Sequence, residues 1–179
     1  MLTKNEMREL LFDKYHRDYV GNKKYTESRY SYLNRSSKEI AHQMRDTIEN
    51  WFSRYPNMEK TEFRKRYCSD NDTLHNAAYF ELYMHELLIR LGHEVKVHPK
   101  TDNGSTKRPD FLATSKNGSY YVEATTTDGK TKNERAAEKR FNEILDSIET
   151  NLHSKNFKIR IEYQEHPAKN LKPTDILRF

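Results

Sequence analysis

Few turns are as well marked in a sequence as the one expected at Asn117-Gly118. An Asn-Gly pair is the strongest short-range signal for a two-residue β-hairpin turn. Two segments with strand character, 109–114 and 120–126, flank this pair. We therefore expect the two segments to be antiparallel neighbours, with side chains of one strand lying opposite those of the other.

Further elements surround this hairpin in a regular order. A helical pattern covers about 73–91 and stops at Gly92, and a strand-like segment follows at 93–97. After the hairpin come a helical pattern at 133–153 and a last strand-like segment at 157–163. The order αβββαβ predicts an α/β domain with a mixed sheet, because a strand that follows a crossover helix can return parallel.

The first part of the chain has a different character. Helical patterns at about 4–14, 36–55 and 59–68 predict a helical extension over residues 1–70. The α/β core then covers residues 71–179.

The segment Tyr15–Arg35 has no helical or strand period and alternates tyrosines with basic residues. Such a mixture can stack bases and neutralise phosphates. A loop whose tyrosines pack on the neighbouring helices explains the same composition, and we favour that interpretation.

Glycine and cysteine usage excludes several classes of protein. The five glycines are far apart, so neither the GxxxxGK[ST] loop nor the GxGxxG turn of nucleotide-binding enzymes is present. The one cysteine, Cys68, cannot form an intramolecular disulfide or a CxxC zinc site, and we interpret it as a packed residue. No apolar run approaches the ~20 residues of a membrane span. We therefore expect a cytoplasmic protein with no membrane partner.

The charge of the chain permits a nucleic-acid partner. Lysine and arginine number 32 against 27 aspartates and glutamates, a formal net charge of +5. A mild positive excess of this kind is compatible with polyanions without requiring them.

A helical wheel of 73–91 predicts which acids reach the sheet. Its apolar stripe consists of Ala77, Phe80, Tyr83, Met84, Leu87, Leu88 and Leu91. Glu81 lies at the edge of this stripe, so we expect it to reach the sheet. Glu86 lies well outside the stripe, and we expect it to face water.

The hairpin supplies two further acids. Asp110 begins one strand and Glu123 lies in the other, so the two can approach across the pair. Clustered carboxylates repel one another unless a positive group joins them, and Mg²⁺ takes oxygen ligands of this kind. A metal held by Asp110, Glu123 and Glu81 could activate water and neutralise a phosphate. This pattern is compatible with a metal-dependent phosphodiesterase, although most scattered carboxylates in proteins are solvated or salt-bridged.

The same residues resemble a known family. Arg108–Phe111 (RPDF) followed by Tyr121–Thr125 (YVEAT) looks like the PD-(D/E)XK nuclease superfamily, and Phe80–Gly92 is similar to its first helix. The resemblance covers about 72–164. It implies a restriction-endonuclease-like αβββαβ core that uses Mg²⁺, with Mn²⁺ as a possible substitute. It also implies that Asp110 and Glu123 are metal ligands, and that Glu81 is a further acidic ligand or orients water.

One position departs from the superfamily. Thr125 stands where the resemblance implies a lysine, so the site lacks that positive charge. Thr125 can hold a water or a substrate oxygen, a basic residue can come from elsewhere, or the site can bind without cutting. The basic residues nearest in the sequence, also our candidates for nucleic-acid contacts, are Lys107, Arg108, Lys130, Lys132 and Arg135.

Three functional hypotheses remain open. The leading one is a metal-dependent nuclease that hydrolyses phosphodiester bonds, with DNA as the expected substrate. The second is a catalytically degenerate module of the same fold that binds nucleic acid or a protein. The third is a helical interaction protein with a structural acidic pair. The histidines show no metal-ligand spacing, and we interpret His85 as an ordinary, partly exposed residue.

Overall fold

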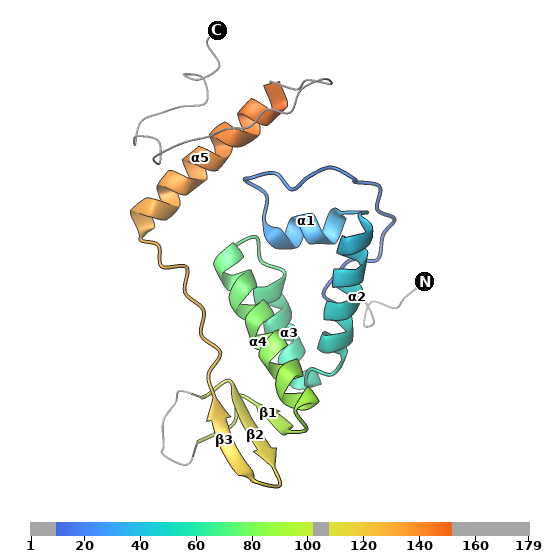
Figure 1. The fold of residues 1–179 in the computed structure, drawn as a ribbon, viewed down its shortest axis with the longest axis vertical. Helices are drawn as coiled ribbons and strands as arrows, with labels where there is room; N and C mark the ends of the chain where they lie inside the picture. Colours follow the sequence, from blue (N-terminus) through green and yellow to red (C-terminus); the bar gives the residue numbers. More distant parts are fainter. Residues whose placement is uncertain (1–9, 102–107, 152–179) are drawn as a thin grey trace. The chain divides into compact units, whose positions relative to one another are not determined.

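The computed structural model describes residues 10–101 and 108–151 (Figure 1). The chain divides into two compact units. The first consists of Met1–Gly21 and Ser28–Thr127, and the second of Asn22–Glu27 and Asp128–Phe179. No helix among the described residues is long and apolar enough to cross a membrane.

Four helices belong to the first unit. They are α1 (Arg29–Arg35), α2 (Glu39–Ser53), α3 (Asn57–Tyr67) and α4 (Asp72–Arg90). Helices α3 and α4 lie side by side, and α1 and α2 also pack against α4. This unit therefore runs across the boundary that we expected between residues 70 and 71.

Two expectations for the N-terminal part are wrong. Helix α1 lies in the segment expected to be a loop, and it begins because the Ser28 side chain accepts a hydrogen bond from the N–H of Ser31. Residues 10–14, expected to be helical, are not. Glu49 of α2 accepts hydrogen bonds from the N–H groups of Leu11 and Phe12 at 2.9 and 2.8 Å, which holds this segment against α2.

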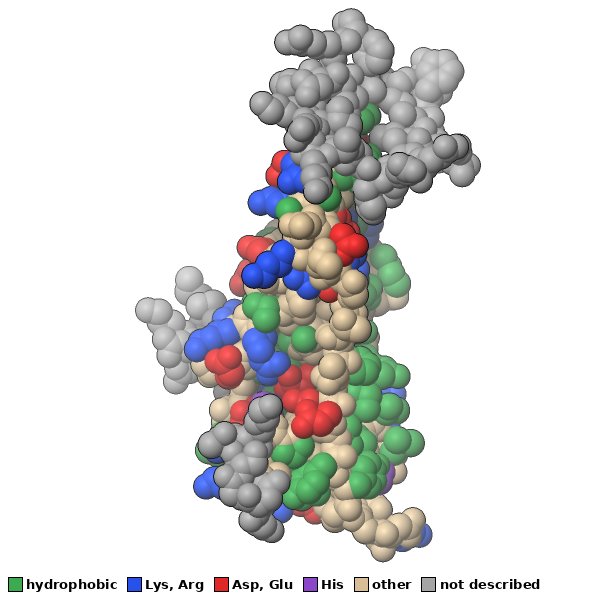
Figure 2. Space-filling model, turned by 90° about the vertical axis from the view of Figure 1, so that its left-hand side faces the viewer, with side chains coloured by type: hydrophobic (Ala, Val, Ile, Leu, Met, Phe, Trp, Pro, Cys, Tyr) green, Lys and Arg blue, Asp and Glu red, His purple; other side chains and the backbone are tan. Residues whose placement is uncertain are grey.

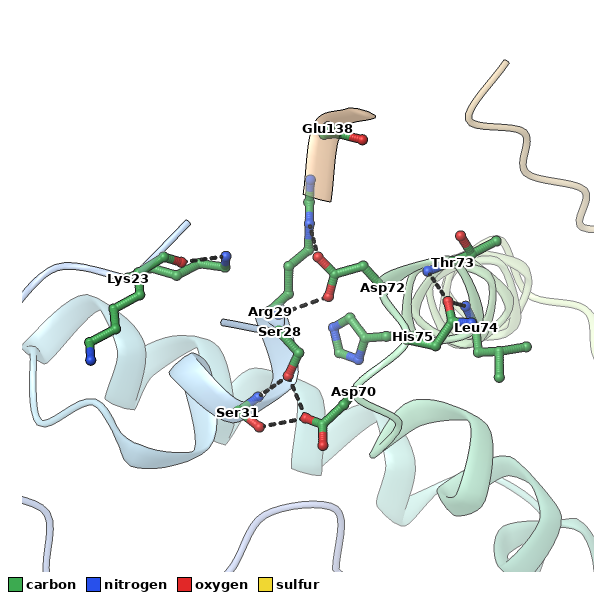
Figure 3. A network of polar contacts seen from close by, with 12 residues as sticks. Lys23, Ser28, Arg29, Ser31, Asp70, Asp72, Thr73, Leu74, His75 and Glu138 are labelled. Carbon is green, nitrogen blue, oxygen red and sulfur yellow. Dashed lines mark hydrogen bonds and ion pairs between the residues drawn. The ribbon is translucent and has the colours of Figure 1, made fainter. Parts of the chain in front are cut away.

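Two aspartates attach helix α1 to the start of helix α4 (Figure 3): Asp70 precedes α4 and Asp72 is its first residue. Asp70 accepts hydrogen bonds from the hydroxyls of Ser28 and Ser31, both at 2.7 Å. These bonds lower the pKa of Asp70. Asp72 accepts a bond from the N–H of Arg29 at 2.9 Å. The first turn of α1 is therefore fixed by carboxylates.

Aromatic side chains form most of the helical core. Phe52, Tyr55, Phe63 and Tyr67 are buried, and the rings contact one another between α2 and α3. Each large ring buries much apolar area. A chain with only 34% hydrophobic residues can build a core in this way.

The buried face of α4 differs from the predicted stripe. Tyr83 and Leu91 are exposed, although we expected both in the core. The buried side chains of α4 are His75, Ala78, Glu81, Leu82, His85, Glu86 and Leu88. The apolar pattern misplaces the face because four of these buried side chains are polar, and the predicted stripe contains none of them.

Helix α2 shows the same effect. Ile40 and Met44 are exposed, and Arg45 is buried. The Arg45 guanidinium donates to the main-chain oxygens of Leu33 and Ser36 at 2.7 and 2.8 Å. A satisfied polar group can therefore occupy a core position that an apolar residue would be expected to take.

The sheet has three antiparallel strands in the order β1-β2-β3. They are β1 (Glu94–Val97), β2 (Phe111–Ser115) and β3 (Gly118–Val122). A hairpin joins β2 to β3 as predicted, but its turn residues are Lys116 and Asn117, one position before the expected Asn117-Gly118 pair. Phe111 and Ala113 are buried in a cluster with Leu88 of α4. The order α4-β1-β2-β3-α5 confirms the first five elements of the predicted αβββαβ pattern. The last strand, expected at 157–163, lies outside the described residues.

Helix α5 (Lys132–Asn151) belongs to the second unit. Its buried side chains are Phe141, Ile144 and Leu145. Asp146 accepts hydrogen bonds from the N–H groups of Tyr25 and Thr26 at 2.6 and 2.9 Å, which attaches the segment Asn22–Glu27 to this helix.

Candidate functional site

The strands bring three polar residues together at one end of the sheet, just past the last paired residues. Val97, Phe111 and Val122 form the last row of paired residues. The next position on each strand is His98, Asp110 and Glu123, which we call the edge row. The main-chain N–H of His98 donates to the main-chain oxygen of Asp110 at 2.9 Å. In the register of β2 and β3, Asp110 and Glu123 therefore occupy facing positions, and the expected approach of the two acids across the hairpin is possible.

Asp110 fixes the end of the hairpin. Its side chain is half-buried, and Oδ2 accepts a hydrogen bond from the N–H of Ala124 at 2.6 Å. A carboxylate that accepts a main-chain N–H makes a strong, charge-assisted bond. Glu123 is exposed. The edge row thus holds one anchored carboxylate and one that water reaches.

Glu81 is buried within the helices and its charge is compensated there. Arg66 of α3 contacts Oε2 at 2.5 Å and Oε1 at 3.1 Å, and the Tyr55 hydroxyl donates to Oε1 at 2.5 Å. The hydrogen bond with Glu81 raises the pKa of Arg66, and burial, followed by the charge of Glu81, raises the pKa of Tyr55. Both carboxylate oxygens of Glu81 therefore already have protein donors.

A histidine connects Glu81 to the edge row. His98 Nε2 lies 3.9 Å from Glu81 Oε1, and His98 Nδ1 lies 3.1 Å from Oε2 of Glu59 on α3. Glu81 thus reaches the sheet edge through His98. Sequence reasoning gave His98 no role. The one signal was its position directly after the strand segment 93–97, level with Asp110.

The three predicted acids do not form one metal-holding cluster. Within residues 10–101 and 108–151, no group of three or more His, Cys, Asp or Glu side chains is arranged to hold a metal. Asp110 and Glu123 suit a hard cation as two oxygen-bearing side chains at adjacent positions. Glu81 does not fit that role as it is placed, because Arg66 and Tyr55 occupy its oxygens.

The expectation that Glu86 faces water is wrong. Its side chain is buried and forms two hydrogen bonds with Arg54, at 3.0 and 2.6 Å, and one with Arg90 at 2.7 Å. Burial raises the pKa of Glu86, but the bonds to the two arginines outweigh it, so the pKa is lowered overall. Arginine partners therefore allow this acid to be buried.

His85 is also buried, contrary to the expected partial exposure. It is 2% exposed and its ring contacts the rings of Tyr55 and Phe111. Burial lowers the pKa of His85 to about 4. Its Nδ1 has no hydrogen-bond partner among the described residues. His85 is therefore a neutral core residue at neutral pH.

The remaining position of the motif lies next to the edge row. Thr125 is exposed and follows the end of β3. Arg108, which precedes Asp110 by two residues, is exposed as well. Lys107 lies outside the described residues. Apart from the acids, the predicted site residues that the structure describes in the first unit are thus Thr125 and Arg108, and both are exposed to solvent.

The predicted basic residues of the second unit are near the start of α5. Lys130 forms an ion pair with Glu138 at 2.7 Å, and Arg135 forms one with Asp128 at 2.9 Å. Lys132 is the exposed first residue of α5. Surface ion pairs of this kind are weak. Figure 2 shows Lys and Arg side chains beside Asp and Glu side chains on one face of the molecule.

The tyrosine-rich segment partly follows the packing interpretation. Tyr30 packs against the helical core, and its hydroxyl donates to the main-chain oxygen of Leu11 at 2.9 Å. Arg35 lies over the Tyr19 ring at 3.4 Å. Tyr25 is exposed. Cys68 is half-buried and its thiol contacts the main-chain oxygen of Leu11, in agreement with a packed residue.

Comparisons of the chain with family models, with curated proteins and with solved structures give no match.

Proposed function

We propose that the chain is a metal-dependent nuclease that hydrolyses phosphodiester bonds of DNA, with Asp110 and Glu123 as the carboxylates that hold Mg²⁺ or Mn²⁺. One observation carries the proposal. Asp110 and Glu123 lie opposite each other one position beyond the last paired row of β2 and β3, at an edge where Glu123 is exposed.

Each residue of the edge row has a distinct part in this proposal. Asp110 is held in place by the N–H of Ala124, so it offers a fixed oxygen, and exposed Glu123 offers a second. A divalent cation bound there would neutralise phosphate charge and activate water. Thr125, two residues after Glu123 and exposed beyond the end of β3, offers a hydroxyl to a water or a substrate oxygen.

Glu81 has a supporting part. Because Arg66 and Tyr55 hold its carboxylate, Glu81 acts on the site through His98 and not as a ligand. This differs from the role implied by the resemblance to the PD-(D/E)XK superfamily. Support for that resemblance comes from the order α4-β1-β2-β3-α5, with Asp110 directly before β2 and Glu123 directly after β3.

The DNA partner rests on charge. The net charge of the chain is +5, and Arg108 is exposed two residues before Asp110. Contacts of lysine and arginine with phosphates make binding weaken as salt rises. The same charges would accept RNA, so the substrate test includes both polymers.

The test is cleavage of single-stranded DNA, double-stranded DNA and RNA with Mg²⁺ or Mn²⁺. We expect Asp110→Asn and Glu123→Gln each to lower the cleavage rate at least ~100-fold, because charge stabilisation at the phosphate is lost. Glu94→Gln is the matched control, since Glu94 is an exposed glutamate at the other end of β1. Cleavage at the wild-type rate by the double variant Asp110→Asn/Glu123→Gln would contradict the assignment of these two residues as metal ligands.

A second function has specific support. Two features favour a nuclease-like module that binds nucleic acid or a protein without cutting: threonine at position 125, and the Glu81 carboxylate bound to Arg66. Calorimetry separates the two functions. A module binds its partner while showing no heat with millimolar Mg²⁺, whereas the nuclease binds the ion.

A further inference from the structure

One backbone feature stands out at the edge row. His98 has a φ of 45°, and it is the only non-glycine residue with positive φ in the described part of the chain. This region is unfavourable for any residue with a Cβ. Residues held in such conformations concentrate at functional sites, where the surrounding structure enforces them.

The positive φ redirects the His98 ring. Val97 faces the helices, since it packs against the hydrophobic core. In a regular strand the next residue would point to the opposite face. The ring of His98 instead contacts acids of two helices, Glu59 on α3 and Glu81 on α4. The unfavourable backbone therefore serves to keep this ring on the helical side of the sheet.

Contacts of His98 join the helices to the predicted ligand strand. The ring lies 3.1 Å from Glu59 and 3.9 Å from Glu81, while the main-chain N–H is bonded to the Asp110 oxygen at 2.9 Å. Asp110 in turn bonds the N–H of Ala124. One continuous series of contacts thus runs from half-buried Glu59 and buried Glu81 to the end of β3.

We propose that His98 is a positioning residue: it ties the Glu59 and Glu81 carboxylates to the strand that carries Asp110, and so fixes Asp110 opposite Glu123. This inference deepens the proposed function and rests on it for its catalytic consequence. The geometric part stands by itself, since it concerns only how firmly Asp110 holds the hairpin end.

The first test measures geometry and needs no activity. In His98→Gly the ring is lost while the positive φ becomes favourable, so the variant should fold. We expect hydrogen exchange of the Ala124 amide, measured by NMR, to accelerate at least ~10-fold, whereas the Leu82 amide in the core of α4 changes less than ~3-fold. His93→Ala is the matched control, because His93 contacts Tyr120 at the other end of β1. Unchanged Ala124 exchange in His98→Gly would overturn the proposal.

A conservative variant sharpens this test. Asparagine tolerates positive φ and has a side chain that can bond Glu59. We expect His98→Asn to restore at least half of the lost Ala124 protection on a logarithmic scale. Exchange in His98→Asn as fast as in His98→Gly would contradict a role for the side-chain bond.

The second test uses catalysis. We expect His98→Gly to lower kcat for DNA cleavage at least ~10-fold and to leave KM within ~2-fold, because the group acts on Asp110 and not on the bound polymer. If the wild type does not cleave, the proposed function fails while the exchange experiment still decides the positioning role. If the wild type cleaves and His98→Gly matches it in both kcat and exchange, the positioning role alone is wrong.

Discussion

The acids of α4 and the acids of the edge row differ in how their charge is compensated. Glu81 and Glu86 are buried, and each is bonded by an arginine through two nitrogens. Asp110 is half-buried and Glu123 exposed, and neither forms an ion pair with any residue that the structure describes. The difference indicates that arginines compensate the α4 acids within the helical core, whereas no described cation compensates the edge acids, which is what the proposed metal site requires.

The largest expected effect is on the buried pair. Arg66→Met leaves the Glu81 carboxylate buried without its cation, which we expect to lower the free energy of unfolding by about 3–5 kcal/mol. Urea denaturation measures this change. The double variant Arg66→Met/Glu81→Leu should recover at least half of the loss, because the buried charge is then gone. A loss below ~1 kcal/mol in Arg66→Met would contradict a structural role for Glu81.

The second effect concerns pH. Burial lowers the pKa of His85 to about 4 in the folded protein, against 6.5 for a free histidine. Between pH 6.5 and 4 the unfolded chain therefore binds a proton that the folded chain does not, and stability falls as the pH is lowered through this range. We expect the free energy of unfolding to fall by about 2–3 kcal/mol between pH 6.5 and 4, because each unit of difference in pKa corresponds to ~1.36 kcal/mol. His85→Leu should show a flatter profile, and an unchanged profile would place His85 outside the core.

The third effect concerns the hairpin that aligns the edge acids. Gly118 has a φ of 129°, which residues with a Cβ rarely adopt. Gly118→Ala should lower the free energy of unfolding by about 1–2 kcal/mol, because the turn then carries backbone strain. The same substitution should reduce activity more than stability alone explains, since Asp110 and Glu123 depend on this register. Wild-type stability in Gly118→Ala would show that another turn can replace this one.

The smallest effects are those of the edge acids on stability. Asp110→Asn should cost about 1 kcal/mol, because a charged acceptor for the Ala124 N–H becomes neutral. Glu123→Gln should change stability by less than ~0.5 kcal/mol, as is usual for exposed positions. Thermal unfolding of the two variants measures both. A large loss of stability in Glu123→Gln would contradict the contrast between the exposed edge acids and the buried acids of α4.

A local signal, the Asn-Gly pair, predicted that a hairpin forms and that β2 and β3 pair antiparallel. The register was not predicted: the turn residues are Lys116 and Asn117, and this shift of one position places Asp110 opposite Glu123, whereas a two-residue turn at Asn117-Gly118 would place it opposite Thr125. The bounds of α4 were also predicted to within one residue at each end.

Long-range partners explain what the sequence could not predict. A helical wheel counts apolar residues, so it placed Glu86 in water and Tyr83 in the core. The structure reverses both. Glu86 can be buried because Arg54, which directly follows α2 and is far from Glu86 in the sequence, compensates its charge. The positive φ of His98 is likewise invisible in a sequence, since tertiary contacts enforce it.

Calorimetric titration with Mg²⁺ tests the role of the edge acids most directly. The wild type and the double variant Asp110→Asn/Glu123→Gln are titrated under the same conditions, with Glu94→Gln as the control. The account predicts millimolar or tighter binding to the wild type and to the control, and at least ~10-fold weaker binding to the double variant. Equal binding to all three proteins, or no binding to the wild type, would contradict it.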